Sequence, residues 1–312
     1  MPLSSYDIVV AGAGPAGIFA AVKLQRLGFQ VLLIAGGWST CISELQSLSP
    51  GFFTLAETIG LDPERISKLL TPVLKSQRLW SGITEEHVSG AGFLTDRLYF
   101  DRKLLLMAEE FGIKVLKPAK IINSVFLNNL WELEINQEGI YRTVKTKFLV
   151  DASGKKSIIR GKKNRVGPQT VAITASWKNT SYPHASTFLE STPGCWIWGG
   201  KSDDEIFHAT VFADPGEISG RSKLMGLYSH ALGKSKLFKT CLERSVLSKI
   251  KAVETTPYYY ENPVGLNFIK TGESNLGFDP ISSQGVQNAI SNAIQAAIVV
   301  NTLYNYPSNA EA

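Results

Sequence analysis

The 312-residue sequence predicts an α/β fold that carries an inserted, mostly antiparallel β-sheet. Three observations lead to this prediction. The N-terminus runs through a β-branched strand, a glycine-rich turn, a helix and a second strand, which is the order of a βαβ unit. Short aromatic and β-branched runs after about residue 166, separated by Gly, Pro and Asp, are typical of antiparallel strands. The last fifty residues return to a strand, a turn and a long helix.

The first turn carries the pattern of a dinucleotide site. Gly12, Gly14 and Gly17 form G-x-G-x-x-G between the strand "YDIVVAG" and a helix that ends at Gly28. The first glycine allows the tight turn, the second lets a pyrophosphate approach the backbone, and the third lets the helix pack on the strand. The helix N-terminus offers free N–H groups to the phosphates. The unit therefore predicts dinucleotide binding.

The second strand, "QVLLIAG", departs from the usual pattern at its end. Such strands normally end in an acidic residue that binds a ribose hydroxyl, whereas this one runs into Ala35, Gly36 and Gly37. Losing a charged hydrogen-bond acceptor is expected to cost about 1.5–3 kcal/mol of affinity. The backbone around Gly36, or a side chain such as Ser39 or Thr40, is the expected compensation.

The middle of the chain is harder to interpret. Residues 43–79 are predicted to be helical with proline breaks, and residues 221–252 to be helical and basic. Between these segments, the runs "SVFLNNLWELEIN" and "YRTVKTKFLVDAS" are each expected to form one strand around a turn at Glu138-Gly139.

Composition excludes several classes of protein. With 44% hydrophobic and 19% charged residues the chain is expected to bury a core, and a net charge of +5 does not indicate a nucleic-acid binder. Three cysteines and four histidines lack ligand spacing, so neither a metal site nor a disulfide framework is predicted. No targeting segment and no membrane span are recognised, and a cytoplasmic location is expected.

Two later segments indicate which dinucleotide is bound. "FLVDASGKKS" ends a predicted strand with Asp151 and leads to Gly154. "TGESNLGFDPISSQGVQNAISNA" carries Glu273 and places Asp279-Pro280 before a helix. Together with "RLYFDRKLL", these segments resemble, in order, the FAD fingerprints of oxidoreductases of the p-hydroxybenzoate hydroxylase type. In that group an R-x-x-F-D arginine lies near the flavin, and a G-D-x(n)-D-P-x-x-x-Q-G segment follows.

The resemblance implies that FAD is the cofactor and names its site. The residues expected to bind FAD are Gly12, Gly14, Pro15, Ala16, Gly17, Gly36, Arg97, Asp151, Gly154, Glu273, Asp279, Pro280, Gln284, Gly285 and Val286. The resemblance also implies a Rossmann-like FAD-binding domain formed by residues 1–165 and 264–312, with a substrate domain formed by residues 166–263.

Finer details are similar to the tryptophan-halogenase-like branch, which includes relatives that hydroxylate tryptophan in a protein. The segments "QSLSPGFFTLAETIGL" and "TFLESTPGCWIWGG" carry this likeness. Of the halogenase signature W-x-W-x-I-P, the chain keeps Trp196 and Trp198, which are candidate substrate contacts, but has Gly200 and Lys201 instead of Ile-Pro. Halogenases capture the oxidised halide with a lysine, for which Lys75 is a candidate, although a solvated helix lysine is the simpler interpretation.

The implied function is an FAD-dependent monooxygenase that hydroxylates an aromatic substrate through a flavin C4a-hydroperoxide. The substrate would be a small molecule, a peptide or a protein-bound group such as tryptophan. Because the chain has only one G-x-G-x-x-G, electrons are expected from a separate flavin reductase or from NAD(P)H without its own domain. Since relatives usually continue beyond the last helix, an open substrate site is expected.

Three alternatives stay open at this point. They are a flavin-dependent halogenase, a flavin-dependent reductase, and a degenerate flavoprotein that binds a partner without chemistry. The missing acidic residue at Ala35–Gly37 favours the last of them.

Overall fold

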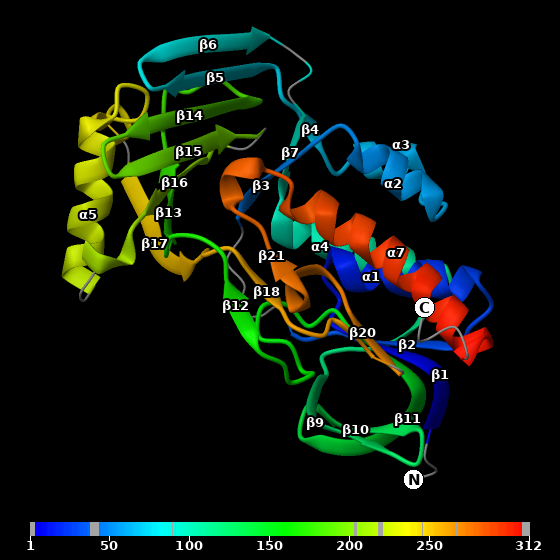
Figure 1. Cartoon of the computed structure of the whole chain (residues 1–312). Coiled ribbons are helices and arrows are strands. Elements are labelled where there is room, and N and C mark those ends of the chain that lie inside the picture. Colours follow the sequence, from blue (N-terminus) through cyan, green and yellow to red (C-terminus); the bar gives the residue numbers. More distant parts are fainter. Residues whose placement is uncertain are drawn as a thin grey trace.

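Two β-sheets with helices between them and beyond them form the molecule. The computed structural model describes residues 4–307 except 38–43, 89, 91, 203–204, 218–220, 245 and 266. In Figure 1 the seven-stranded sheet and α5 (Arg221–Lys234) lie at the upper left, and the eight-stranded sheet lies below α1 (Pro15–Arg26) and α7 (Gly285–Asn305). Within the described part of the chain no helix is both long and apolar enough to cross a membrane.

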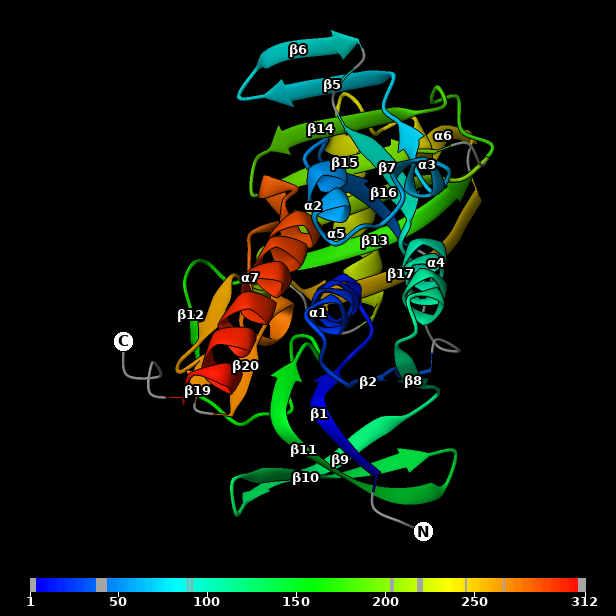
Figure 2. The same ribbon diagram turned by 90° about the vertical axis from the view of Figure 1, so that its right-hand side faces the viewer.

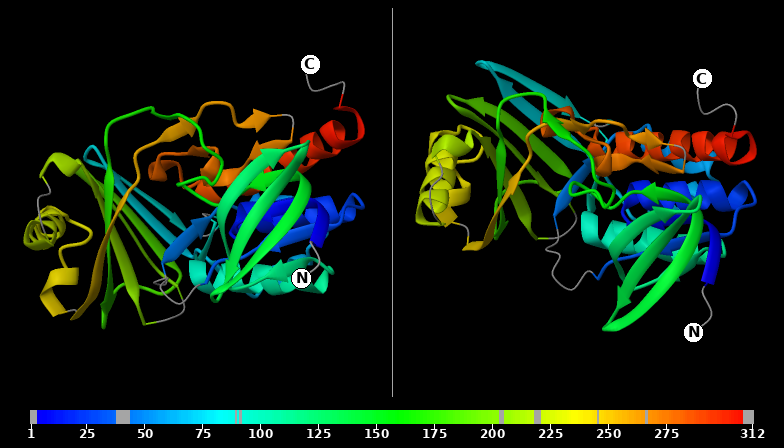
Figure 3. Two further views of the ribbon diagram at one scale, coloured as in Figure 1. Left: turned by 90° about the horizontal axis from the view of Figure 1, so that it is seen from below. Right: turned by 60° about the horizontal axis from the view of Figure 1, so that its bottom comes forward.

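The eight-stranded sheet has a parallel centre and a curled antiparallel margin. Its order is β19-β20-β11-β1-β2-β8, and β10 and β9 continue antiparallel from the long strand β11. This curl lies far from α5 (Figure 3). The strands are β1 (Ser4–Ala11), β2 (Val31–Ile34), β8 (Lys114–Leu116), β9 (Lys120–Leu127), β10 (Leu130–Gln137), β11 (Ile140–Asp151), β19 (Val264–Gly265) and β20 (Phe268–Lys270).

Helices α1, α7 and α4 (Arg97–Glu110) pack beside one another on the parallel sheet (Figure 2). Helix α1 is apolar on nearly every side, as expected for a helix enclosed between a sheet and two other helices. Phe19 of α1, Phe52 and Phe100 are fully buried in the core that these helices share with the sheet. Gly17 permits the closest approach, because a Cβ there would lie 1.8 Å from the Gly12 carbonyl oxygen.

The seven-stranded sheet runs in the order β17-β13-β16-β15-β14-β5-β6 and is antiparallel except where β14 meets β5. Helices α5 and α6 (Cys241–Arg244) cover its outer face with an apolar core that contains Phe207, Val211 and Tyr228. The strands are β5 (Lys75–Trp80), β6 (Ile83–Val88), β13 (Val171–Lys178), β14 (Ser186–Thr192), β15 (Cys195–Lys201), β16 (Phe207–Ala213) and β17 (Val246–Glu254).

Short elements connect the two large sheets. They form two three-stranded sheets, β3-β7-β4 and β12-β18-β21, together with small helices. These elements are β3 (Leu45–Leu48), β4 (Thr71–Pro72), β7 (Phe93–Asp96), β12 (Lys163–Arg165), β18 (Tyr258–Tyr260), β21 (Leu276–Gly277), α2 (Phe52–Thr58), α3 (Pro63–Ser67), and the 3-10 turns η1 (Pro215–Glu217), η2 (Gly272–Ser274) and η3 (Pro280–Ser282).

The predicted α/β class with an inserted antiparallel sheet is confirmed, but several local predictions are wrong. In the described part of this segment, residues 44–79, the structure has two short helices, α2 and α3, and the strands β3, β4 and most of β5, instead of a largely helical chain. The helical prediction for 221–252 fails after α6, where β17 begins. "SVFLNNLWELEIN" forms parts of two strands, since Asn128 and Asn129 both adopt positive φ and turn the chain.

The strand pairing also differs from the predicted division into domains. Strands β5 and β6 lie within residues 1–165, which were expected to belong entirely to the FAD-binding domain. Strand β5 pairs instead with β14, and β6 pairs with β5 at the margin of the second sheet. The second sheet therefore draws strands from both sides of the predicted boundary.

Replacing Gly17 with alanine is expected to destabilise the fold by about 1–3 kcal/mol, because the added methyl group overlaps the backbone of the first turn. Urea unfolding of the variant measures this loss. Gly226→Ala in α5 is the matched control, since a Cβ there meets nothing within 4 Å and alanine favours the helix. Equal stability of Gly17→Ala and the unmodified protein would contradict the predicted close packing.

Candidate active site

The G-x-G-x-x-G turn lies at the carboxyl ends of the parallel strands. Gly12 has φ +105°, and a Cβ on it would lie 2.3 Å from the Ala152 carbonyl oxygen, so this position requires glycine. Gly14 is the N-cap of α1, which has no capping side chain and no acidic residue in its first turn. No acidic side chain of α1 itself therefore competes for the N–H groups at its N-terminus. This is what a helix that binds phosphate requires.

Arg97 belongs to the same region. It begins α4, and its Nη2 lies 4.0 Å from the position that a Cβ on Gly14 would occupy. Its Nε donates to Asp101 Oδ1 at 2.8 Å, which holds the guanidinium beside the glycine turn. Burial raises the pKa of Asp101, and the Arg97 cation opposes that rise. The ion pair therefore holds the Arg97 guanidinium beside the glycine turn, where phosphates would be expected.

Asp151 is fully buried and binds the chain itself. Its Oδ1 accepts from the backbone N–H and the hydroxyl of Ser153, at 3.0 and 2.6 Å. Its Oδ2 accepts from the Ser157 hydroxyl at 2.6 Å and the Ile159 N–H at 3.0 Å. Both carboxylate oxygens are thus engaged by the loop that follows β11. Asp151 therefore fixes the conformation of this loop, in which Gly154 has φ +82°. The Asp151 carboxylate is not directed at a ligand.

The Gly272-Glu273 segment is tied to the same strand end. The backbone oxygen of Asp151 accepts from Thr271 N–H at 2.9 Å and from the Ser274 hydroxyl. The Tyr258 hydroxyl donates to the Glu273 carbonyl oxygen at 2.6 Å. The Glu273 side chain itself is exposed and lines a cavity. It is the carboxylate of this region that remains available to a ligand.

The segment from Asp279 to Val286 forms the turn before α7. Asp279 caps η3 by accepting from Ile281 N–H at 3.0 Å, so its carboxylate supports the turn. Gln284 and Gly285 are exposed at the N-terminus of α7, which has no acidic residue in its first turn. Val286 is buried in the core, so its side chain points away from any ligand at this end. The helix N-terminus therefore favours negative charge in front of it.

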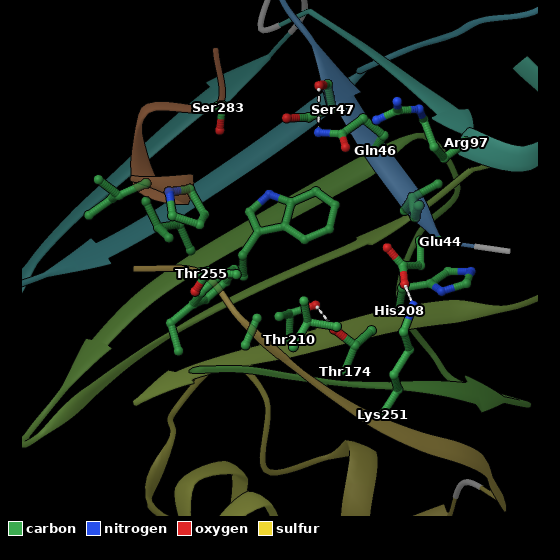
Figure 4. Close-up of a pocket in the computed structure, with 18 of the residues that line it drawn as sticks. Glu44, Gln46, Ser47, Arg97, Thr174, His208, Thr210, Lys251, Thr255 and Ser283 are labelled. Atoms are coloured by element: carbon green, nitrogen blue, oxygen red, sulfur yellow. Dashed lines mark hydrogen bonds and ion pairs between the residues drawn. The ribbon is translucent and has the colours of Figure 1, made fainter. Parts of the chain in front are cut away.

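A cavity of about 570 Å³ lies where these elements face the seven-stranded sheet (Figure 4). Its floor is formed by β13–β17, and its opposite side by β3, the start of α4, Glu273 and the η3 turn. Of the predicted site residues, Arg97, Glu273, Pro280, Trp196 and Trp198 line this cavity. A neighbouring cavity of about 190 Å³ is lined by Glu273, Asp279, Pro280 and Gly285.

The floor of the larger cavity has an aromatic part and a polar part. Trp196 stacks on Phe212 with ring centroids 3.7 Å apart. Figure 4 shows Thr174, Thr210 and Lys251 on the floor, facing Glu44, Gln46 and Arg97. Lys251 forms an ion pair with Glu44 across the space between the two parts of the molecule.

Lys75, the candidate lysine for halide capture, was predicted on a helix, and that prediction is wrong. It is the first residue of strand β5 and is not among the residues that line the cavity. Trp177 belongs to the core and donates to the Tyr228 hydroxyl at 3.0 Å. Ser39 and Thr40, considered as replacements for the missing acidic residue, lie outside the described residues.

Sequence reasoning overlooked most polar residues of the cavity, including Glu44, Thr174, His208, Thr210 and Lys251. A usable pattern existed in the run "IFHATVF", where His208, Thr210 and Phe212 alternate with apolar residues. In a strand this alternation places the three side chains on one face. The location of that face opposite β3 and the start of α4 could not be read from the run alone.

Comparison with known proteins agrees with this geometry. No protein-family model matches the chain. Over 309 residues it is 25% identical to LodB of Marinomonas mediterranea, assigned as an FAD-dependent oxidoreductase, with 93% of this chain and 83% of that protein covered. It is 26% identical over 333 residues to a tryptophan 2-halogenase of Chondromyces crocatus, with 96% of this chain covered. The chain spans 62% of the length of that halogenase.

Among solved structures, the peptidyl tryptophan dihydroxylase QhpG superposes with a TM-score of 0.85 at 25% identity. The alignment covers 99% of this chain and 69% of QhpG. The chain is a relative of the FAD-dependent oxidoreductases of the halogenase-like and tryptophan-hydroxylating branch. The predicted resemblance is thereby confirmed, as is the expectation of an enzyme that uses FAD.

The end of β2 provides a test of FAD binding. Gly36 is exposed, a Cβ on it would meet nothing within 4 Å, and the strand end lies beside Gly12, whose N–H donates to the Ile34 carbonyl at 2.9 Å. Gly36→Glu is expected to tighten FAD binding roughly 10-fold or more, by restoring a charged acceptor for the ribose. The dissociation constant measured by calorimetry checks this, with Gly36→Gln as the uncharged control. Equal affinities of the Glu and Gln variants would show that the ribose lies elsewhere.

Proposed function

We propose that this protein is an FAD-dependent monooxygenase that hydroxylates an aromatic group, with tryptophan in a peptide or protein as the favoured substrate. One observation carries the proposal. The cavity has FAD-fingerprint residues on one side, Arg97, Glu273 and Pro280, and the Trp196–Phe212 stack on the other. A flavin held by the first group would face an aromatic ring held by the second. The similarity to QhpG along nearly the whole chain supports the choice of substrate.

The residues present fit FAD. The glycine turn and the uncapped N-terminus of α1 suit a pyrophosphate, and Arg97 supplies the countercharge. Glu273 offers an exposed carboxylate at the adjoining cavity. When bound and reduced, FAD supplies the reaction with O2. Its electrons would come from a separate flavin reductase or from NAD(P)H.

The chain itself contributes orientation, charge and exclusion of water. Gly285 lines the smaller cavity at the N-terminus of α7, where the helix end would stabilise negative charge on a bound flavin. Trp196 and Phe212 provide an apolar surface on which an aromatic substrate can stack. Holding both rings between the two sheets keeps the reacting atoms away from bulk water.

Position 200 favours hydroxylation over halogenation. A Cβ on Gly200 would lie 2.9 Å from Leu45 Cδ2, and Leu45 lines the cavity. The isoleucine of the halogenase signature would therefore require the end of the Leu45 side chain to shift. In this chain the Leu45 side chain occupies that space from the opposite side of the cavity. The halogenase signature cannot be completed without moving Leu45.

Halogenation remains the second candidate because Lys251 lines the cavity. An oxidised halide needs a lysine amine close to the aromatic substrate. Lys251, unlike Lys75, lies on the cavity floor, but its ammonium is paired with Glu44.

Incubation of the protein with FAD, a flavin reductase, NADH and N-acetyl-L-tryptophanamide separates these functions. Under isotopically labelled O2, mass spectrometry is expected to show labelled oxygen in the product, in equal yield with and without bromide. Lys251→Met is expected to keep this hydroxylation, because the amine is not used. A brominated product that disappears in Lys251→Met would overturn the proposal in favour of a halogenase.

A further inference from the structure

Strand β17 forms one margin of the seven-stranded sheet, and among the described elements it pairs only with β13. Figure 1 shows β17 and β6 at opposite ends of this sheet. A strand at a margin presents backbone N–H and C=O groups along its outer edge, and these groups can pair with a strand of another chain. The outer edge of β17 therefore offers a binding surface to an extended polypeptide.

A hydrogen bond at the end of β17 shows which of its backbone groups face outward. The Thr255 N–H donates to the Thr170 carbonyl oxygen at 2.8 Å, so the backbone of Thr255 faces β13. Along an antiparallel strand the backbone groups of successive residues face alternate sides. Those of Val253 therefore also face β13, whereas those of Ala252 face outward.

The contacts of Glu254 agree with this alternation. Its carbonyl oxygen accepts from Lys155 Nζ at 2.5 Å and so points away from β13. This contact closes the outer edge at Glu254. The backbone groups of Ala252 and Ile250 also face outward, and no partner for them is found within the described part of the chain. Ala252 is exposed, so this part of the edge is accessible.

The same strand forms part of the cavity floor. Lys251, Val253 and Thr255 line the cavity, and Figure 4 shows the first and the last of them. Val253 is 42% exposed although it lines the cavity, so the cavity is open to solvent at β17. A polypeptide bound to the outer edge would therefore pass the open side of the cavity.

Strand geometry determines which side chains of such a polypeptide would enter the cavity. Residues opposite each other on neighbouring strands point to the same face of the sheet, and successive residues alternate between the faces. A residue opposite Val253 would thus point into the cavity, and its two neighbours would point away from it. In the sheet register Val253 is followed by Ala172, which has a small side chain, and then by Phe212. A ring that enters over Val253 and Ala172 approaches the Trp196–Phe212 stack.

We propose that the outer edge of β17 binds the backbone of a peptide or protein substrate as an added antiparallel strand, from which the aromatic residue enters the cavity. An extended peptide fits this edge because its backbone supplies donors and acceptors at the two-residue spacing of Ala252 and Ile250. Lys155 limits the paired segment, since it occupies the Glu254 carbonyl oxygen. The inference rests on the proposed function for the reaction at the ring.

The affinities of two ligands for the FAD-loaded protein test the proposal. One ligand is N-acetyl-L-tryptophanamide, and the other is an acetylated and amidated seven-residue peptide of serine and threonine with tryptophan at its centre. Calorimetry is expected to show the peptide binding roughly 10-fold more tightly, because hydrogen bonds to the edge add to the contacts of the ring. Equal affinities would overturn the proposal.

Methylation of single backbone nitrogens in the peptide tests the strand geometry without altering the protein. In antiparallel pairing the residues next to the tryptophan direct their N–H groups at β17, whereas the tryptophan and the residues two positions away direct theirs away from it. Methylation next to the tryptophan is expected to weaken binding about 3- to 10-fold, and methylation at the alternate positions to have little effect. The opposite alternation would support an added strand in parallel orientation. Equal losses at every position would overturn the proposal.

Ala252→Pro removes an outward N–H group that the sheet does not use. Proline is accepted in a margin strand when its missing N–H would face solvent, so the fold is expected to persist. The variant is expected to reduce the ratio of peptide affinity to N-acetyl-L-tryptophanamide affinity about 5-fold or more, because the edge loses a donor and gains a bulky ring. Ala252→Val keeps the N–H group and is the matched control. An unchanged ratio in a proline variant that unfolds in urea like the unmodified protein would contradict the proposal.

Other occupants of the edge and failure of the proposed function give different results. A dimer that Ala252→Pro abolishes, together with equal affinities for the two ligands, would assign the edge to a second copy of this chain and overturn the proposal. Alternating losses in a protein that adds no oxygen to the tryptophan of the peptide would support the peptide edge and contradict the monooxygenase. Oxygen addition to both ligands at equal affinities would support the monooxygenase and contradict the peptide edge.

Discussion

The buried carboxylate of Asp151 is the constraint on which the site depends. Four donors from residues 153–159 saturate it at the end of β11, and the backbone oxygen of the same residue holds Thr271 and Ser274. Two segments that are more than a hundred residues apart in sequence are thereby fixed at one strand end. Because Ala152 lies against Gly12, the glycine turn is fixed there as well. A buried carboxylate is stable only when its acceptor positions are filled, so these segments fold as one unit.

The site also requires a surface opposite the segments that Asp151 holds together. The seven-stranded sheet buries an apolar core on the α5 side and presents the Trp196–Phe212 stack and the Thr174–Thr210 pair on the other. Glu44, just before β3, pairs with Lys251, and Leu45, the first residue of β3, lies close to Gly200. In the proposed function the cavity therefore lies between the part of the molecule that would bind FAD and the sheet that would receive an aromatic ring. This arrangement of the two sides of the cavity is the basis of the proposed aromatic monooxygenase.

The sequence was informative where a backbone conformation demanded one residue type. Gly12 and Gly17 are required by contacts with neighbouring backbone, and the motif predicted both. Long-range pairing was not predictable: β5 joins β14, more than a hundred residues away, so the segment around Lys75 was expected to be helical. In β17, Val246, Ile250 and Val253 recur at helical spacing, and a register shift against β13 at Ala175–Trp177 disturbs the strand pattern. The role of Asp151 in holding its own loop was also hidden, because a motif does not show which atoms accept.

The central claim is that FAD and an aromatic substrate meet in the cavity between the two sheets. Titration of the protein with FAD, followed by addition of N-acetyl-L-tryptophanamide while the visible absorption spectrum of the flavin is recorded, tests it most directly. We predict one FAD bound per chain and a saturable change of the flavin spectrum when the tryptophan ligand is added. A protein that does not bind FAD, or a bound flavin whose spectrum does not respond to the ligand, would contradict the account.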